Sequence, residues 1–147
     1  MSENHDEFLK DIQRQCLTVG SEHVTAMAES LVKLNSDLLP TLTFLMKEAH
    51  SLKGDFNSVG FLSCSEFIHA FETALTAVEE NVKPFGGKLL EEDARVLEFF
   101  LSDALQALSS YFGDLLKTLI DKDEYLKVRA YTLETLRTWK PDQRTAA

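Results

Sequence analysis

Proline and glycine are scarce in this chain of 147 residues, which contains three prolines and six glycines. Their scarcity, together with plentiful leucine, alanine, glutamate and lysine, favours helices over a β-sandwich or a barrel. A chain of this length is typical of one domain that buries a sizeable core without disulfides or metals. The composition therefore predicts an all-α fold in a single domain.

Cysteine is also scarce, and Cys16 and Cys64 lie too far apart to form a CxxC pair. This usage indicates a reduced, cytoplasmic compartment. The first residues, "MSENHDEF", are acidic and do not resemble a signal peptide. The most apolar run, "LLPTLTFLM", is too short to span a bilayer and contains a proline. We expect a soluble cytoplasmic protein.

Basic residues are in the minority, with 15 Lys and Arg against 24 Asp and Glu and a formal net charge of -9. Such a chain repels nucleic-acid phosphates and anionic lipid. Neither nucleic acid nor a membrane surface is therefore expected as a partner.

Apolar residues recur every three or four positions, which is the spacing of amphipathic helices. The first segment predicts a helix from about residue 5 to 34, bent or broken at "VGSE" around Gly20. Its expected buried stripe is Phe8, Ile12, Cys16, Val19, Met27, Leu31 and Leu34. A second helix follows the link "NSD", with Ser36 or Asp37 as its cap and Pro40 in its first turn. Its expected buried residues are Leu42, Leu45, Ala49, Leu52 and Phe56.

Three further helices follow. Ser63 and Glu66 have the spacing of a capping box at the start of the third helix, and "NVKPFGG" is a loop. A fourth helix begins near Glu91, and Leu90 is expected to be the first residue of its buried apolar stripe. A fifth helix covers about 122–139, ahead of the polar segment "KPDQRTAA". Short links make neighbouring helices antiparallel. We therefore predict an up-and-down antiparallel four-helix bundle with an additional C-terminal helix, comprising residues 1–139, and a flexible tail or linker over 140–147.

The stretch "KEAHSLKGDFNSVG" places an unusual set of residues on the exposed side of the second helix. His50, Lys53, Gly54 and Asn57 fall on the side opposite its apolar stripe. Lys53 lies one turn beyond His50, close enough to share an anion with the imidazole. Glycine costs a helix about 1 kcal/mol relative to alanine, so Gly54 suggests a steric requirement beside His50.

His69 and Glu72 lie three residues apart at one edge of the third helix. An antiparallel neighbour would bring that edge beside His50. A carboxylate that accepts the Nδ1 hydrogen fixes the imidazole tautomer and leaves Nε2 as the nucleophilic nitrogen. His5 and His23 have no comparable set of neighbours and are interpreted as solvated surface residues.

Neither a metal site nor a nucleotide site is expected. Glu66 and His69 form one Glu-x-x-His motif, but a di-iron site in a bundle needs a second one and further inward glutamates. The stretch "PFGGK" lacks the first glycine and the Ser/Thr of a phosphate-binding loop, where Val82 and Leu89 stand instead. The sequence therefore predicts no metal and no cofactor.

The pattern "AHSLKG", followed by the pair Gly60-Phe61 and by His69 and Glu72, resembles the histidine phosphotransfer (HPt) domain family. The likeness is strongest to the N-terminal phosphotransfer domains of chemotaxis histidine kinases of the CheA type, and it covers most of the chain, including the extra helix. One departure is the segment "DFNSV" after Gly54, which is bulkier and more acidic than the small residues usual there.

This resemblance implies a role in phosphoryl transfer. His50 would accept a phosphoryl group on Nε2 and pass it to an aspartate of a response-regulator receiver domain. Lys53 would balance the phosphoryl charge, Gly54 would leave room for approach, and Glu72 with His69 would orient the imidazole. The donor would be a histidine kinase or its ATP-binding domain, so the chain on its own would be a phosphoryl carrier and not an enzyme.

Two alternatives to a stand-alone relay protein, expected to be a monomer, stay open from the sequence. One is the N-terminal module of a larger CheA-like kinase. The other is a docking bundle whose histidine is never phosphorylated.

Overall fold

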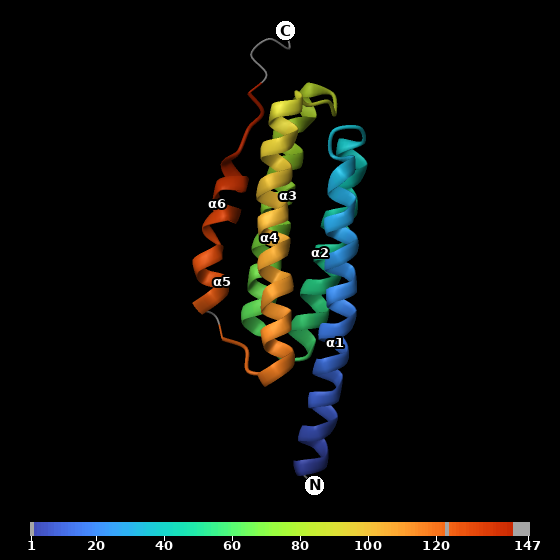
Figure 1. Ribbon diagram of the computed structural model, residues 1–147, viewed down its shortest axis with the longest axis vertical. Coiled ribbons are helices and arrows are strands. Elements are labelled where there is room, and N and C mark those ends of the chain that lie inside the picture. Colours follow the sequence, from blue (N-terminus) through green and yellow to red (C-terminus); the bar gives the residue numbers. More distant parts are fainter. Residues whose placement is uncertain (1, 123, 143–147) are drawn as a thin grey trace.

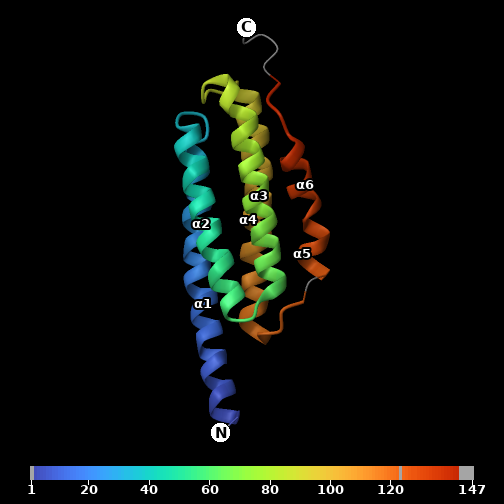
Figure 2. The same ribbon diagram turned by 180° about the vertical axis from the view of Figure 1, so that it is seen from behind.

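A computed structural model of the protein describes residues 2–122 and 124–142, and these residues form helices with no strand. The elements are α1 (Ser2–Ser30), the 3-10 turn η1 (Leu31–Lys33), α2 (Leu38–Ser58), α3 (Leu62–Val82), the 3-10 turn η2 (Lys83–Phe85), α4 (Glu91–Thr118), α5 (Glu124–Arg129) and α6 (Tyr131–Thr138). The four long helices run alternately up and down, and α5 and α6 lie along the side of α3 and α4 (Figures 1 and 2). The predicted bundle with an added C-terminal segment is confirmed.

The core is formed by apolar side chains at helical spacing, and its centre is aromatic. Phe56 of α2 packs against Phe112 of α4, with ring centroids 4.8 Å apart, and against Phe61 at 6.1 Å. All three rings are fully buried. Aromatic pairs of this kind add to the free energy gained from burying their area. They also fix α2 at the level of the turn that leads into α3.

The predicted bend in α1 is wrong, because the helix runs unbroken through Gly20. A Cβ at this position would lie 2.8 Å from Cζ of Phe56 and 3.4 Å from Cε2 of Phe112. Gly20 therefore serves close packing between α1 and the aromatic centre.

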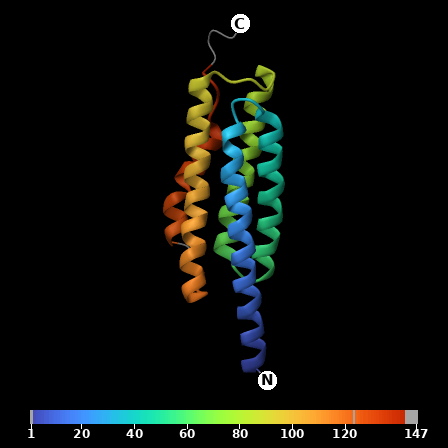
Figure 3. The ribbon, with the colours of Figure 1, turned by 45° about the vertical axis from the view of Figure 1, so that its right-hand side comes forward.

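Part of the stripe predicted for α1 is not buried. Phe8 is 63% exposed and Val19 is 41% exposed. The first turns of α1 project beyond the ends of the other long helices, so Phe8 has no neighbouring helix to cover it (Figure 3). The apolar spacing predicts the helix, but it does not show how far the neighbouring helices reach along it.

Leu90, predicted to point inward, is also exposed, because it lies just before the first turn of α4.

Two helix starts differ from the predicted capping. Asp37 is the N-cap of α2, as expected, but its side chain makes no capping hydrogen bond. The predicted capping box of Ser63 and Glu66 is wrong, since α3 already begins at Leu62. The carboxylate of Asp121 instead accepts hydrogen bonds from the backbone N–H groups of Ser63, at 2.9 Å, and Cys64, at 3.4 Å. Tyr111 also donates its hydroxyl to Asp121.

The single helix predicted for 122–139 is two short helices, α5 and α6, separated at Ala130. Arg129 donates to the carboxylate of Asp103 at 2.8 Å, and Thr132 donates to the same carboxylate at 2.9 Å. Beyond α6, the backbone N–H of Asp142 lies 3.0 Å from both carboxylate oxygens of Asp93. The remainder of the predicted tail, 143–147, lies outside the described residues.

Candidate functional site

The antiparallel pair α2 and α3 carries all the residues predicted for the site (Figure 2). Gly60 makes the turn between the two helices with a φ of +88°, a conformation that side chains with a Cβ rarely adopt. Leu52 and Phe56 of α2 are buried in the core and set the rotation of the helix about its own axis. The opposite side of the helix, with His50, consequently faces solvent.

His50 contacts Glu72 as the sequence predicted. Nδ1 of His50 lies 3.0 Å from Oε2 of Glu72, which is hydrogen-bonding distance. The His50 side chain is 71% exposed, whereas Glu72 is only 21% exposed. A carboxylate at Nδ1 favours the tautomer with hydrogen on that nitrogen, so the lone pair is on Nε2.

Lys53 contacts the second oxygen of the same carboxylate. Its Nζ donates to Oε1 of Glu72 at 2.8 Å. Partial burial acts to raise the pKa of Glu72, but the hydrogen bonds and charges of Lys53 and His50 outweigh it and hold that pKa below its ordinary value. Glu72 is therefore ionised at neutral pH, and its two oxygens order the side chains of His50 and Lys53.

His69 and Gly54 are placed less tightly. Nδ1 of His69 lies 3.8 Å from Oε1 of Glu72, which is too long for a hydrogen bond, and its ring is largely exposed. A Cβ added to Gly54 would meet nothing within 4 Å, so no packing inside the chain requires glycine there. The open space beside His50 is on the solvent side, where a partner would approach.

Two contacts were missed by the sequence reasoning. His23 is not an isolated surface residue, because its Nδ1 lies 3.0 Å from Oε1 of Glu48 and joins α1 to α2. Ser65 of α3 donates its hydroxyl to the backbone carbonyl of Lys53 at 3.0 Å. The signal for Ser65 was available, since it lies on the same helix face as His69 and Glu72, four and seven residues before them.

The two cysteine thiols are poorly suited to act as nucleophiles at neutral pH. Burial, followed by the nearby charge of Asp55, raises the pKa of Cys16 to about 11. Burial also raises the pKa of the Cys64 thiol well above its ordinary value, with Asp121 adding to the shift. Both thiols are free and remain protonated at neutral pH.

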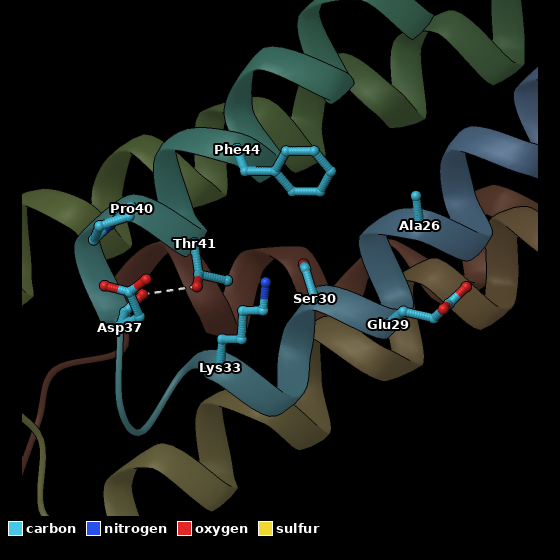
Figure 4. A pocket seen from close by; sticks show the side chains of 8 residues that line it. All are labelled: Ala26, Glu29, Ser30, Lys33, Asp37, Pro40, Thr41 and Phe44. Atoms are coloured by element: carbon cyan, nitrogen blue, oxygen red, sulfur yellow. Dashed lines mark hydrogen bonds between the residues drawn. The ribbon is translucent and has the colours of Figure 1, made fainter.

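A large cavity of the surface lies away from His50, in the groove between the end of α1 and the start of α2. It has a volume of about 560 Å³, and Lys33, Thr41 and Phe44 are among its lining side chains (Figure 4). None of the predicted site residues lines it.

Within residues 2–122 and 124–142, no group of three or more His, Cys, Asp or Glu side chains is placed to hold a metal ion. Over the same ranges, no helix combines the length and the apolar character needed to cross a bilayer.

Comparison with known proteins assigns the chain to a family. The sequence profile of the Hpt domain matches residues 9–111, which include α2, α3 and every predicted site residue. The chain belongs to the Hpt domain family. The resemblance inferred from "AHSLKG" and its downstream pair is thereby confirmed, and Hpt domains are helical bundles of the kind seen here.

A curated relative of this Hpt domain is the chemotaxis protein CheA of Halobacterium salinarum. The two are 32% identical over 78 residues, which cover 52% of this chain and 11% of the relative. The matched part is thus about a tenth of the relative's length. No solved structure matches the chain. Membership of the family supports a histidine phosphotransfer role in a phosphorelay.

Proposed function

We propose that His50 is the phosphoryl-carrying residue of this Hpt domain, and that Nε2 accepts the group. The observation that carries the proposal is the pairing of an exposed imidazole with Glu72, which engages Nδ1 and leaves Nε2 facing solvent. A nucleophilic nitrogen needs both a lone pair and open access. His50 has both of these features.

The reaction is a pair of displacements at phosphorus. The Nε2 lone pair forms an N–P bond as the bond from phosphorus to the donor's leaving oxygen breaks. In the second step, an aspartate carboxylate of a receiver domain forms a P–O bond as the N–P bond breaks. Glu72 stabilises the positive charge that the imidazole ring gains when Nε2 is phosphorylated. The ring loses this charge in the second step, when the N–P electron pair returns to Nε2 and neutral imidazole is regenerated. Lys53 lies one turn away to offset the phosphoryl charge. His69 is assigned a weaker supporting role at the rim, and Gly54 leaves clearance for the partner.

On this proposal the chain is a phosphoryl carrier that is phosphorylated in trans, and it is not a kinase on its own. Its partners are an ATP-binding kinase domain as donor and a response-regulator receiver domain as acceptor. It acts as a monomer, because an exposed histidine on a single helix pair needs no second subunit, no metal and no cofactor to react. We place it in the cytoplasm together with its ATP-dependent donor.

The finer assignment is to a chemotaxis-type pathway. The similarity to a chemotaxis protein supports it, and the same similarity favours the chain acting as the phosphotransfer module of a larger CheA-like kinase. Mixing the chain with receiver domains from chemotaxis and from other pathways tests this assignment. Fastest transfer to the chemotaxis receiver is the expected result, and no preference would contradict it.

The central proposal is tested by incubating the protein with radiolabelled ATP and a cognate kinase, alongside a His50→Gln variant. Acid-labile label on the wild type and none on the variant is expected. Equal labelling of both proteins would rule out His50. Partner binding with no labelling of either protein would instead identify a docking bundle.

A further inference from the structure

Ser65 is a buried hydroxyl on the face of α3 that meets α2. It is 7% exposed, and the other residues buried along α3 are apolar. A buried hydroxyl costs free energy unless it is hydrogen-bonded, and alanine would suit this apolar face equally well. The bond that Ser65 makes to the carbonyl of Lys53, at 3.0 Å, is therefore the feature that distinguishes serine here.

The position of this bond links it to the histidine site. Ser65 and Glu72 lie seven residues, or about two helical turns, apart on the same side of α3. Both contact Lys53 of α2, Ser65 at the backbone carbonyl and Glu72 at the ammonium. A carbonyl oxygen has two lone pairs, so it can accept from Ser65 while it remains in the α2 ladder. The two contacts attach α2 to α3 at two points beside His50.

Side-chain packing cannot replace these contacts on the outer side of α2. His50 is largely exposed, and a Cβ at Gly54 would meet nothing within 4 Å. Leu52 and Phe56 hold this part of α2 from its buried side, and on the outer side hydrogen bonds to α3 supply the contacts that packing does not. The bond from Ser65 is uncharged, so it persists whatever the protonation state of Glu72 or the phosphorylation state of His50.

We propose that Ser65 is a positioning residue, whose hydroxyl fixes α2 against α3 so that Glu72 stays within hydrogen-bonding distance of Nδ1 of His50. The structural part of the proposal concerns the imidazole tautomer. Its kinetic consequence, slower phosphoryl acceptance when the hydroxyl is lost, rests on the function proposed above.

The test compares Ser65→Ala with Ser65→Thr, which keeps the hydroxyl, and with a control that loses a buried hydroxyl elsewhere. Thr41 provides this control, because it is 4% exposed and its hydroxyl donates to the carbonyl of Asp37, the N-cap residue of the same helix, at 2.7 Å. Two quantities are measured on each intact protein. The first is the fraction of neutral His50 with hydrogen on Nδ1, from imidazole ¹⁵N chemical shifts, and the second is the rate of phosphoryl acceptance from the kinase.

Ser65→Ala is expected to lower the Nδ1–H fraction and to slow acceptance by about three- to tenfold, as small misplacements of reacting groups do. Thr41→Ala is expected to lower stability and leave both quantities unchanged, and Ser65→Thr to restore both. An unchanged tautomer fraction in Ser65→Ala, or a Ser65→Thr variant that behaves like alanine, would overturn the positioning role. A changed tautomer with no phosphorylation of any variant, wild type included, would uphold that role and refute the proposed function instead.

Discussion

Glu72 is the residue that converts an ordinary surface histidine into an oriented one. It is half-buried, it is ionised, and it contacts His50 and Lys53 with different oxygens. Histidine and lysine on one exposed helix face are common, and neither alone indicates a site. The carboxylate supplied by the neighbouring helix orients both side chains and so distinguishes this pair from an ordinary surface pair.

Replacing Glu72 with alanine should slow phosphoryl acceptance without unfolding the bundle. The variant loses the hydrogen bond that selects the Nδ1–H tautomer, while the side chain lies at the edge of the core and contributes little packing. A decrease of about tenfold to a hundredfold is expected, the scale of a lost orienting partner. Rapid-quench kinetics with the kinase, together with circular dichroism as a check on folding, measure it. An unchanged rate would remove the orienting role.

Stability should depend on pH through the same carboxyl group. The pKa of Glu72 is lower in the folded protein than its ordinary value of 4.5. Its contribution to the free energy of unfolding is thus complete above pH 4.5 and is lost as pH falls through the lower folded value. The contribution should be about 1 kcal/mol, since the pair is partly solvated.

The measurement is urea unfolding of wild type and Glu72→Gln between about pH 3 and pH 7. The wild type should be more stable near neutrality, and its advantage should shrink in acid. An advantage that stays constant or grows on acidification would contradict the assignment.

At the scale of helices, two glycines that look alike in the sequence have opposite roles. Gly20 lies in α1 against the buried rings of Phe56 and Phe112, whereas Gly54 faces open space in α2. Helix propensity alone favours alanine by about 1 kcal/mol at both positions. The surroundings of each glycine therefore decide whether its replacement by alanine stabilises or destabilises the protein.

Gly54→Ala should stabilise the protein by about 0.5–1 kcal/mol and slow phosphoryl transfer, because the added methyl occupies the approach to His50. Gly20→Ala should destabilise it by about 1–3 kcal/mol, because the buried rings must shift. Urea unfolding and transfer rates of both variants check these expectations. A stabilised Gly20→Ala would show that the aromatic centre yields easily, and an unimpaired Gly54→Ala would refute the clearance role.

The start of α3 should depend on Asp121, a residue far from it in the chain. Asp121→Ala removes the acceptor for the N–H groups of Ser63 and Cys64 and should cost about 1–2 kcal/mol. Ser63→Ala, which tests the capping box instead, should cost little. Amide hydrogen exchange at the first turn of α3 separates the two, and the reverse order of effects would contradict the assignment.

These elements show what periodicity can and cannot predict. The order of the four long helices and most of their buried faces follow from apolar residues that recur every three or four positions, because that spacing is a property of one helix. The need for glycine at position 20 and the cap from Asp121 arise between segments distant in sequence, so no local pattern reveals them. The exposure of Phe8 follows from the lengths of the other helices, which α1 outreaches.

The site was more predictable than the caps, for a physical reason. Antiparallel neighbours with a short turn have little freedom of register, so His50 and Glu72 were expected to meet once both helices were recognised. Ser65 shares a helix face with His69 and Glu72, but its hydrogen bond was not predicted, because the partner is a backbone carbonyl, which no residue type marks.

On the scale of the molecule, the bundle presents the imidazole on an exposed helix face. The large groove between α1 and α2 contains none of the site residues (Figure 4). An exposed site carries a group but does not enclose a reaction, so on the proposed function the donor and acceptor domains supply the rest of each reaction centre. This arrangement suits a carrier that two different partners approach in turn.

The most direct test of the account is to identify the phosphorylated atom. The protein is phosphorylated by its kinase, and the product is analysed by mass spectrometry and by ³¹P and ¹⁵N NMR. We predict one phosphoryl group per chain, on Nε2 of His50, because Nδ1 is held by Glu72. A phosphoryl group on Nδ1 of His50, or on His69 or any other residue, would contradict the account.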